Sequence, residues 1–267
     1  MALQIAKTFP RFFLEKTCTC QKKTLILQPQ TFEMTKMKTI FTDFCRRNAA
    51  FLTGWLLLSV VAVLAICLVP KEELHLLLNR YHTAWLNSFF FHYTHFCNWP
   101  MYVLMLLPLL FRRPVWSAVF GATEGLSAII THVVKYFWNL PRPKLVFEDL
   151  AGTHPGLYDA WQQSLVEAVE LHSWYSFPSG HTTAFFAFFA TLAFLYAEEP
   201  KAPCKQEVGL ICLILAALGG YSRIYLSQHF LLDVTVGMTI GVLSSVGIFY
   251  IFLKKNVNLS AHFKRSH

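Results

Sequence analysis

The sequence predicts an all-α, polytopic membrane protein with six transmembrane helices. Of its 267 residues, 55% are hydrophobic and only 14% are charged, whereas a typical soluble domain has about 25% charged residues. The apolar residues come in runs of roughly 20, which is the length needed to cross a bilayer core of about 30 Å. Proline or basic residues close several of these runs. These features together indicate a chain that crosses a membrane repeatedly.

Residues 1–50 form a basic segment that we expect to be cytoplasmic and poorly ordered. Lys and Arg outnumber Asp and Glu in it, and no short apolar stretch with a small-residue cleavage site indicates a secretory signal. Met34 and Met37 are alternative starts, and each would leave a short basic leader before the first span. We therefore expect residues 1–33 to be dispensable.

The apolar segments are expected to form one domain over residues 51–253, followed by a basic cytoplasmic tail at 254–267. Residues 71–88 mix charged residues with Leu and aromatic residues, which predicts an amphipathic helix lying in the membrane interface. Residues 136–177 are expected to form a long polar loop. The six spans are expected at residues 51–69, 89–111, 115–134, 182–197, 208–221 and 234–253.

Basic residues beside the spans predict the orientation, because cytoplasmic loops are enriched in Lys and Arg. Six spans place both termini on one side. If that side is the cytoplasm, it also receives the basic residues at 46–47, 112–113, 201, 205 and 254–255. We therefore expect the net charge of +8 to serve membrane topology and contact with anionic lipid headgroups, and not nucleic-acid binding.

Three short stretches lie at the span ends that this topology places away from the cytoplasm. They are Lys135 to Pro143 (KYFWNLPRP), Phe177 to His181 (FPSGH) and Ser222 to Asp233 (SRIYLSQHFLLD). Together they supply three fixed cations, two histidines and one carboxylate. Such a set can hold a phosphate group, attack it and protonate its leaving group.

His229 and Asp233 are four residues apart, a spacing that puts two side chains on one face of a helix. A carboxylate that binds one ring nitrogen of a histidine fixes the tautomer and leaves the other nitrogen to attack. We therefore expect His229 to be the nucleophile of a phosphohistidine mechanism and Asp233 to orient it. Taken alone, the pair could also be structural residues at the start of the sixth span. The other two stretches argue against that reading.

His181 follows Ser179 and Gly180 at the start of the fourth span. Glycine lets the backbone approach an anion, and a helix N-terminus directs N–H groups toward it. Ser179 and Gly180 are therefore expected to contact the phosphate, and His181 is expected to protonate the leaving oxygen. Because His229 must be neutral and His181 charged, we expect a bell-shaped pH–rate profile.

Lys135, Arg142 and Arg223 are expected to stabilise the negative charge on the phosphoryl oxygens. For Lys135 and Arg142, simple snorkelling to the membrane interface is the alternative. No cluster has metal-ligand spacing, so no metal or cofactor is expected. Glu124 lies in the middle of the third span, about 16 Å from Lys135 along a helix. We expect Glu124 to form a structural hydrogen bond to a neighbouring span.

The spacings K-x6-RP, PSGH and SR-x5-H-x3-D occur in this order and without a gap. Together they resemble the three-part signature of the type 2 phosphatidic acid phosphatase superfamily, the lipid phosphate phosphatases. The resemblance covers roughly residues 51–253. It implies a metal-independent phosphatase whose partner is a phosphorylated membrane lipid, and it assigns the nucleophile to His229.

The segment VELHSWYSFPSGHTTAFF, taken with SRIYLSQHFLLD, is most similar to bacterial enzymes that act on lipid A or related envelope lipids. We therefore expect a lipid A phosphatase of a bacterial inner membrane with its active site facing the periplasm. The alternatives are an undecaprenyl pyrophosphate or phosphatidylglycerophosphate phosphatase, a lipid-linked phosphotransferase and a non-catalytic lipid-binding scaffold. Vanadate-dependent haloperoxidases share these motifs, but their soluble build contrasts with this chain. The oligomeric state is left open.

Overall fold

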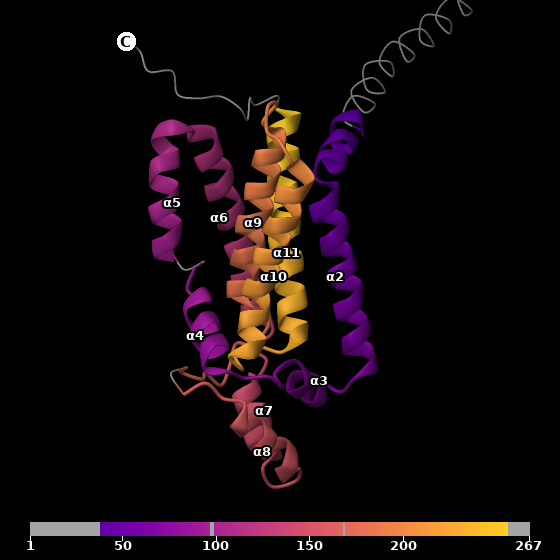
Figure 1. Cartoon of the computed structure of the whole chain (residues 1–267), viewed down its shortest axis with the longest axis vertical. Helices are drawn as coiled ribbons and strands as arrows, with labels where there is room; N and C mark the ends of the chain where they lie inside the picture. Colours follow the sequence, from indigo (N-terminus) through magenta and orange to yellow (C-terminus); the bar gives the residue numbers. More distant parts are fainter. Residues whose placement is uncertain (1–37, 97–98, 168, 256–267) are drawn as a thin grey trace, which may run out of the picture. The chain divides into compact units, whose positions relative to one another are not determined.

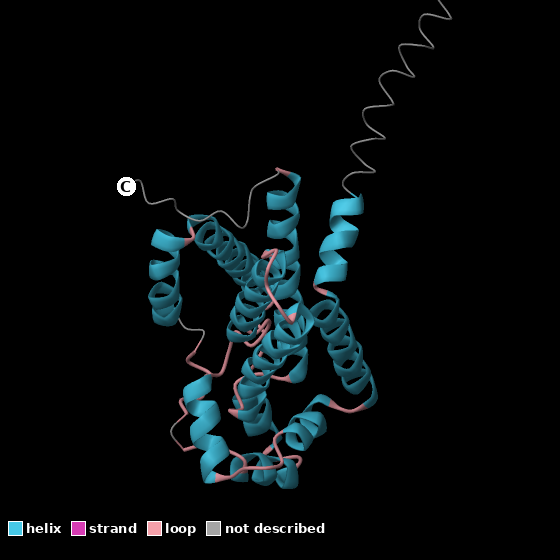
Figure 2. Ribbon diagram, turned by 45° about the horizontal axis from the view of Figure 1, so that its top comes forward, coloured by secondary structure: helices cyan, strands magenta, loops and turns pink. Residues whose placement is uncertain are grey.

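The computed structural model describes residues 38–96, 99–167 and 169–255, and these contain helices and no strand (Figures 1 and 2). The all-α prediction is therefore confirmed for the part of the chain that is described. Residues 38–44 are helical and belong to a compact unit separate from residues 45–267. The helices of the larger unit are α2 (Ala49–Leu68), α3 (Lys71–Leu78), α4 (Ala84–Tyr93), α5 (Trp99–Arg112), α6 (Pro114–Phe137), α7 (Pro143–Leu150), α8 (Pro155–Gln163), α9 (Gly180–Glu198), α10 (Lys205–Tyr225) and α11 (Leu231–Lys254).

Five helices among the described residues are long and apolar enough to cross a membrane, namely α2, α6, α9, α10 and α11. They correspond to five of the six predicted spans, and the chain is an integral membrane protein. The expectation for residues 1–33 lies outside the described residues, as does most of the predicted tail at 254–267.

The predicted second span, residues 89–111, is not one continuous helix. The chain forms α4 and α5 there, with 10 and 14 residues, and residues 97–98 between them are outside the described part. Each helix alone is shorter than the roughly 20 residues that a crossing requires. In Figure 1 they follow one another along the long axis of the bundle, α5 beside α6. The count of six spans is therefore not confirmed and stays a prediction.

Helix α9 lies at the centre of the bundle, since 72% of its membrane window is buried compared with 11% of that of α2. Small residues let its neighbours approach it closely. A Cβ atom at Gly219 of α10 would lie 2.2 Å from the Phe185 ring, and one at Gly237 of α11 would lie 2.7 Å from the Ser179 carbonyl oxygen. The close contact at Gly237 brings the first turn of α9 against the first turns of α11.

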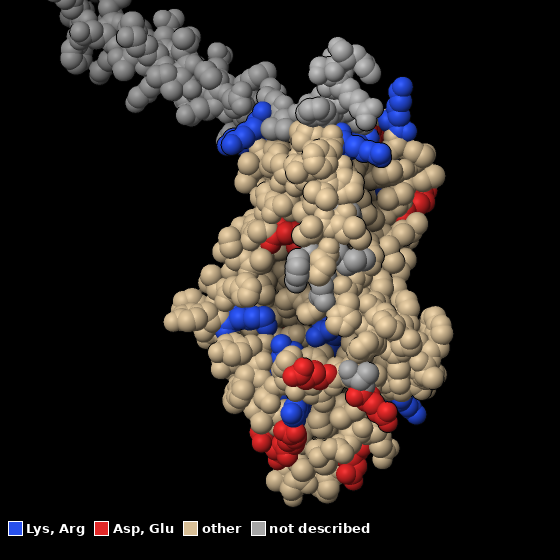
Figure 3. All heavy atoms as spheres, turned by 90° about the vertical axis from the view of Figure 1, so that its left-hand side faces the viewer, with Lys and Arg blue, Asp and Glu red and all other residues tan. Residues whose placement is uncertain are grey.

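Ion pairs join the helix ends opposite the three motifs. Arg47 pairs with Glu198 at 3.0 Å, and Arg113 pairs with Glu199. These contacts hold the end of α9 to the starts of α2 and α6. Figure 3 shows one face of the molecule, with Lys and Arg at the top, a largely uncharged band below them, and both acidic and basic side chains toward the bottom.

The segment expected as a polar loop, residues 136–177, contains the two short helices α7 and α8. Each begins with proline at its first position, where the missing N–H and the fixed φ favour a helix start. The rings of Phe147 and Trp161 stack with centroids 5.3 Å apart, and both are packed in one buried cluster with Phe230. The two helices thereby rest on the residue that directly follows His229.

The amphipathic helix expected over residues 71–88 is also interrupted. Helix α3 stops at Asn79, whose backbone N–H closes its last turn. Helix α4 starts after Thr83, whose hydroxyl accepts the N–H of Leu86 at 3.2 Å. Hydroxyl side chains are favoured at helix N-caps because they satisfy such N–H groups. The predicted single helix is therefore two helices joined by a short link.

Candidate active site

The ends of α6, α9, α10 and α11 that carry the motifs lie at one end of the bundle, and residues 226–230 link α10 to α11. His229 lies in this link and is 2% exposed. The N–H groups of Gln228 and His229 both donate to the Arg223 carbonyl oxygen, at 2.9 and 3.1 Å. The third motif is therefore folded as one compact unit around its own arginine.

His229 faces Asp233. The two side chains meet as predicted, but they do not share a helix face, because His229 precedes the start of α11 at Leu231. Nδ1 of His229 lies 3.4 Å from Oδ2 of Asp233. The same carboxylate oxygen accepts the Phe230 N–H at 3.0 Å and the Ser176 hydroxyl at 2.5 Å. With Nδ1 directed at the carboxylate, Nε2 is the ring nitrogen that points away from Asp233.

The surroundings of His229 favour its neutral form. Burial lowers the pKa of His229 to about 3, and Arg142 and Arg223 act in the same direction, while the hydrogen bond and charge of Asp233 oppose the change. Desolvation penalises the imidazolium ion because the protein interior solvates charge poorly. At neutral pH the imidazole therefore keeps its lone pair, as a nucleophile requires.

The three cations of the motifs lie within electrostatic range of one another. Arg223, at the end of α10, is 7% exposed and donates from Nη1 to the Thr94 hydroxyl at 2.6 Å. Its Nε is buried and has no hydrogen-bond partner among the described residues. Lys135, at the end of α6, donates to the Tyr175 carbonyl oxygen at 2.6 Å. A buried donor such as Nε of Arg223 is suited to an anionic ligand.

Arg142 directly precedes α7 and binds two different segments. Its Nε donates to the Trp174 carbonyl oxygen at 2.9 Å, and its Nη1 donates to Oε1 of Gln228 at 2.9 Å. Burial lowers the pKa of Arg142, and the charge of Asp233 opposes this change. These contacts hold the guanidinium group beside the third motif, which simple snorkelling would not require.

The PSGH motif begins α9, and Ser179 caps the helix. The Ser179 hydroxyl accepts from the hydroxyl of Thr182 at 2.8 Å, and its backbone N–H donates to the Asp233 carbonyl oxygen at 3.0 Å. A Cβ atom at Gly180 would only reach ordinary contact with Thr131, at 3.8 Å. His181 interacts electrostatically with Arg223 and His229. The second motif thus lies beside the third, and phosphate contacts from Ser179 and Gly180 stay predictions.

Three residues that hold these charged groups were not identified from the sequence. They are Ser176, which binds Asp233, Gln228, which binds Arg142, and Thr94, which binds Arg223. A single sequence does not single them out, because each is a common polar residue. Ser176 and Gln228 lie beside or inside a motif, whereas Thr94 is far from all three in sequence. Within the described ranges, no group of three or more His, Cys, Asp or Glu residues is placed to hold a metal ion.

Glu124 is hydrogen-bonded to Tyr102 of the adjacent helix α5. This agrees with the structural hydrogen bond to a neighbouring span expected from the sequence. The Tyr102 hydroxyl donates its one proton to the Ala184 carbonyl oxygen of α9 at 2.9 Å. Glu124 and Tyr102 therefore join α5, α6 and α9 inside the bundle.

A family model described as "PAP2 superfamily" matches residues 116–257, just over half of the chain. The crystal structure of Aquifex aeolicus LpxE superposes with a TM-score of 0.52 and 26% identity, covering 67% of this chain and 94% of that one. The structure of a PAP2-type phosphatidylglycerolphosphate phosphatase from Bacillus subtilis also gives a TM-score of 0.52. Its identity is 19%, and the match covers 80% of this chain and 99% of that one. This second likeness concerns the fold alone.

Two curated relatives match shorter regions. Bacitracin transport permease protein BcrC from Bacillus licheniformis is 39% identical over 75 residues, which are 28% of this chain and 32% of that protein. Phosphatidylglycerophosphatase B from Bacillus subtilis (strain 168) is 34% identical over 71 residues, 26% of this chain and 35% of that protein. The chain thus spans about a third of the length of the curated relatives that it matches.

Proposed function

This chain belongs to the PAP2 superfamily, and we propose that it is a membrane lipid phosphatase that acts through a phosphohistidine. The observation that carries the proposal is the buried pair of His229 and Asp233, which lies among three cations, Lys135, Arg142 and Arg223. A neutral nucleophile in a cationic site is suited to attack on a phosphate group, whose negative charge the cations stabilise.

In the proposed reaction, Nε2 of His229 attacks phosphorus and forms a P–N bond as the P–O bond to the lipid breaks. Arg223 and Arg142 disfavour a positive charge on His181, and we propose that the negative charge of the bound phosphate offsets them. The protonated His181 then donates its proton to the departing oxygen, which leaves as the lipid alcohol. Water then attacks phosphorus and forms a P–O bond as the P–N bond to His229 breaks, while His181 accepts a proton from that water, and inorganic phosphate is released. Each step uses side chains and water, and we propose that the reaction needs no metal ion.

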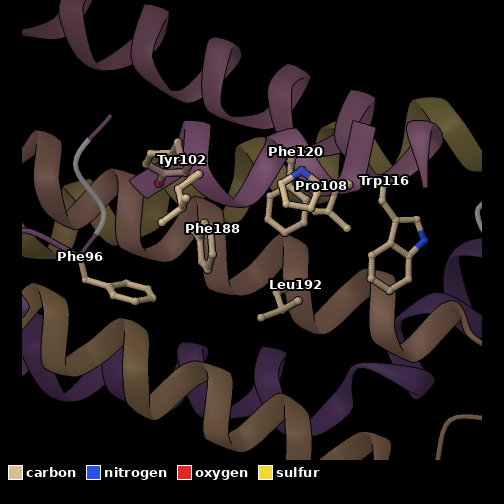
Figure 4. Close-up of a pocket in the computed structure, with 9 residues that line it drawn as sticks. Phe96, Tyr102, Pro108, Trp116, Phe120, Phe188 and Leu192 are labelled. Atoms are coloured by element: carbon tan, nitrogen blue, oxygen red, sulfur yellow. The ribbon is translucent and has the colours of Figure 1, made fainter. Parts of the chain in front are cut away.

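An apolar cavity supports a lipid as the substrate. It has a volume of about 530 Å³ and lies between α5, α6 and α9, where Tyr102, Phe120 and Phe188 line it (Figure 4). Thr94, which binds Arg223, is two residues from Phe96, which also lines the cavity. A residue that lines the cavity thus lies close in sequence to one that holds Arg223, and we propose that an acyl chain of the substrate occupies the cavity.

For the lipid itself we propose lipid A, because the second and third motifs are most similar to bacterial enzymes of envelope lipids. The similarity to phosphatidylglycerophosphatase B makes phosphatidylglycerophosphate the second substrate to test. We further propose that the enzyme lies in a bacterial inner membrane with six spans and both termini cytoplasmic. The motif end of the bundle would then face the periplasm.

The test is phosphate release by the purified protein in detergent with a metal chelator present. The substrates are lipid A, undecaprenyl pyrophosphate, phosphatidylglycerophosphate and phosphatidic acid. The proposal expects release from at least one lipid, loss of that release in His229→Ala, and full activity in His154→Gln, which alters an exposed histidine. Folded protein that releases no phosphate from any lipid, or that depends on an added metal, would contradict the proposal.

A further inference from the structure

Residues 173–176 form a short segment, here called the strap, that lies against the first motif just before FPSGH. The backbone N–H of Arg142 donates to the Ser173 carbonyl oxygen at 2.8 Å. The Arg142 and Lys135 side chains bind the next two carbonyl oxygens, those of Trp174 and Tyr175. The two proposed phosphate-binding cations of the first motif therefore fix the position of the strap.

The last residue of the strap, Ser176, points its side chain into the catalytic pair. It is 1% exposed, and its backbone N–H donates to the Leu140 carbonyl oxygen at 3.0 Å. Its hydroxyl oxygen lies 2.5 Å from Oδ2 of Asp233 and 3.4 Å from Nδ1 of His229. Since a carboxylate only accepts, the hydroxyl donates its proton to Asp233.

The contact matters because the Asp233 side chain can rotate about its terminal bond. The Phe230 N–H donates to Oδ2 at 3.0 Å from one direction. The Ser176 hydroxyl donates to the same oxygen from a second direction and from another part of the chain. Two donors that converge on one oxygen hold the carboxylate plane, and with it the ring of His229. A nucleophile reacts efficiently only when such supporting contacts hold it close to the productive geometry.

We propose that Ser176 is a positioning residue for the nucleophile, which it orients through the carboxylate of Asp233. Ser176 acts on the substrate only through Asp233 and His229, so its effect belongs to kcat and not to lipid binding. This inference rests on the proposed function, in which His229 attacks the phosphate.

The first test compares Ser176→Ala with wild type under steady-state conditions on the preferred lipid. Loss of a hydrogen bond to a charged acceptor predicts a kcat about 10-fold lower, with KM unchanged within about twofold. Ser176→Thr keeps the hydroxyl and is expected to recover most of the rate. Ser245→Ala is the matched control, because Ser245 is equally buried on α11 and donates to the Ala187 carbonyl oxygen. Its kcat is expected to equal that of wild type.

The second test introduces Ser176→Ala into an Asp233→Ala protein. If Ser176 acts through Asp233, the second substitution changes the remaining rate by less than about twofold, because residues that act as a unit are not additive. An equal loss in both backgrounds, or a higher KM at unchanged kcat, would overturn the inference. If Ser176→Ala does not fold, Ser176→Cys takes its place, because a thiol is close in size to the hydroxyl and a weaker donor. A kcat equal to that of wild type in Ser176→Cys would also overturn the inference.

These outcomes separate the inference from the function on which it rests. A wild-type protein that releases no phosphate would contradict the proposed function and remove the inference with it. A wild-type protein that is active while Ser176→Ala keeps its full kcat would contradict only the role of Ser176.

Discussion

Among the single residues of the site, Arg223 has two roles, one through its backbone and one through its side chain. Its carbonyl oxygen accepts the N–H groups of Gln228 and His229, so its backbone shapes the turn that carries His229. Its guanidinium group is held by Thr94 and keeps a buried Nε without a protein partner among the described residues. A planar guanidinium with several donors can bind two phosphate oxygens at once, whereas an ammonium group acts as a point charge.

Arg223→Lys is therefore expected to lower kcat/KM about 30-fold or more, because it keeps the positive charge but loses the paired, charge-assisted hydrogen bonds. Steady-state kinetics on the preferred lipid measure this loss. Arg47→Lys is the control, since Arg47 pairs with Glu198 at the opposite end of the bundle, and it is expected to leave kcat/KM unchanged. If Arg223→Lys were as active as wild type, Arg223 would not bind the phosphate as proposed.

At the scale of the elements, the contact between α9 and α11 positions His181 relative to His229. Gly237→Ala would place a Cβ atom 2.7 Å from the Ser179 carbonyl oxygen, which is backbone and can move only with the start of α9. Such overpacking costs about 1–3 kcal/mol. We expect a lower melting temperature in detergent and a reduced kcat.

The matched control for this prediction is Gly247→Ala, on the same helix. A Cβ atom at Gly247 would meet no heavy atom of the described residues within 4 Å, so stability and kcat are expected to stay at or above wild-type values. Equal behaviour of the two alanine variants would show that the approach of α9 to α11 does not limit the site.

Helix α3 supports the turn of the third motif from outside the bundle. Nε2 of His75 and Nδ2 of Asn79 both lie 3.0 Å from the Ser227 hydroxyl. Ser227 has a φ of 50°, a left-handed conformation that is unfavourable for a residue with a side chain. The two contacts from α3 therefore help to hold the strained residue two positions before His229.

This arrangement predicts that stability depends on pH through His75. Burial lowers the pKa of His75 from 6.5 to about 4, while the negative charge of Asp233 opposes this change. Above pH 6.5 both folded and unfolded states hold a neutral imidazole. As the pH falls from 6.5 toward 4, only the unfolded state gains the proton, and the folded state loses about 3 kcal/mol of stability.

His75→Gln removes this proton uptake, so its melting temperature is expected to fall less steeply than that of wild type between pH 6.5 and 5. The measurement is thermal unfolding in detergent across this range. His154→Gln, at an exposed position, is expected to keep the wild-type slope. An unchanged slope in His75→Gln would contradict the proposed buried, neutral state of His75.

For the molecule as a whole, the sequence was sufficient to predict the spans with sustained hydrophobicity and to predict that the three motifs lie together. Prediction from the sequence failed where tertiary contacts decide the structure. Helices α7 and α8 have eight and nine residues and depend on the cluster of Phe147, Trp161 and Phe230 for their stability. Likewise, Ser176 becomes part of the site only because the fold brings the strap to Asp233, which single-sequence spacing does not encode.

The cavity between α5, α6 and α9 connects the fold to the choice of substrate. Leu192 lines it, and Leu192→Trp would fill part of its volume. If an acyl chain binds there, KM for a long-chain lipid is expected to rise about 10-fold or more, while a short-chain phosphate ester is hydrolysed as by wild type. Leu243→Trp is the control, since Leu243 is 54% exposed on α11. If Leu192→Trp left the KM for the long-chain lipid at its wild-type value, the acyl chain would bind elsewhere.

Trapping the phosphorylated protein tests directly whether His229 itself becomes phosphorylated. The purified protein is mixed with lipid labelled in its phosphate group, quenched within milliseconds, and assayed for label bound to protein. We expect label that is stable in base and lost in acid, as for a phosphohistidine. We also expect the label to map to the peptide containing His229 and to be absent in His229→Ala. Phosphate release by wild type with no trapped label, or label that persists in His229→Ala, would contradict the proposed phosphorylation of His229.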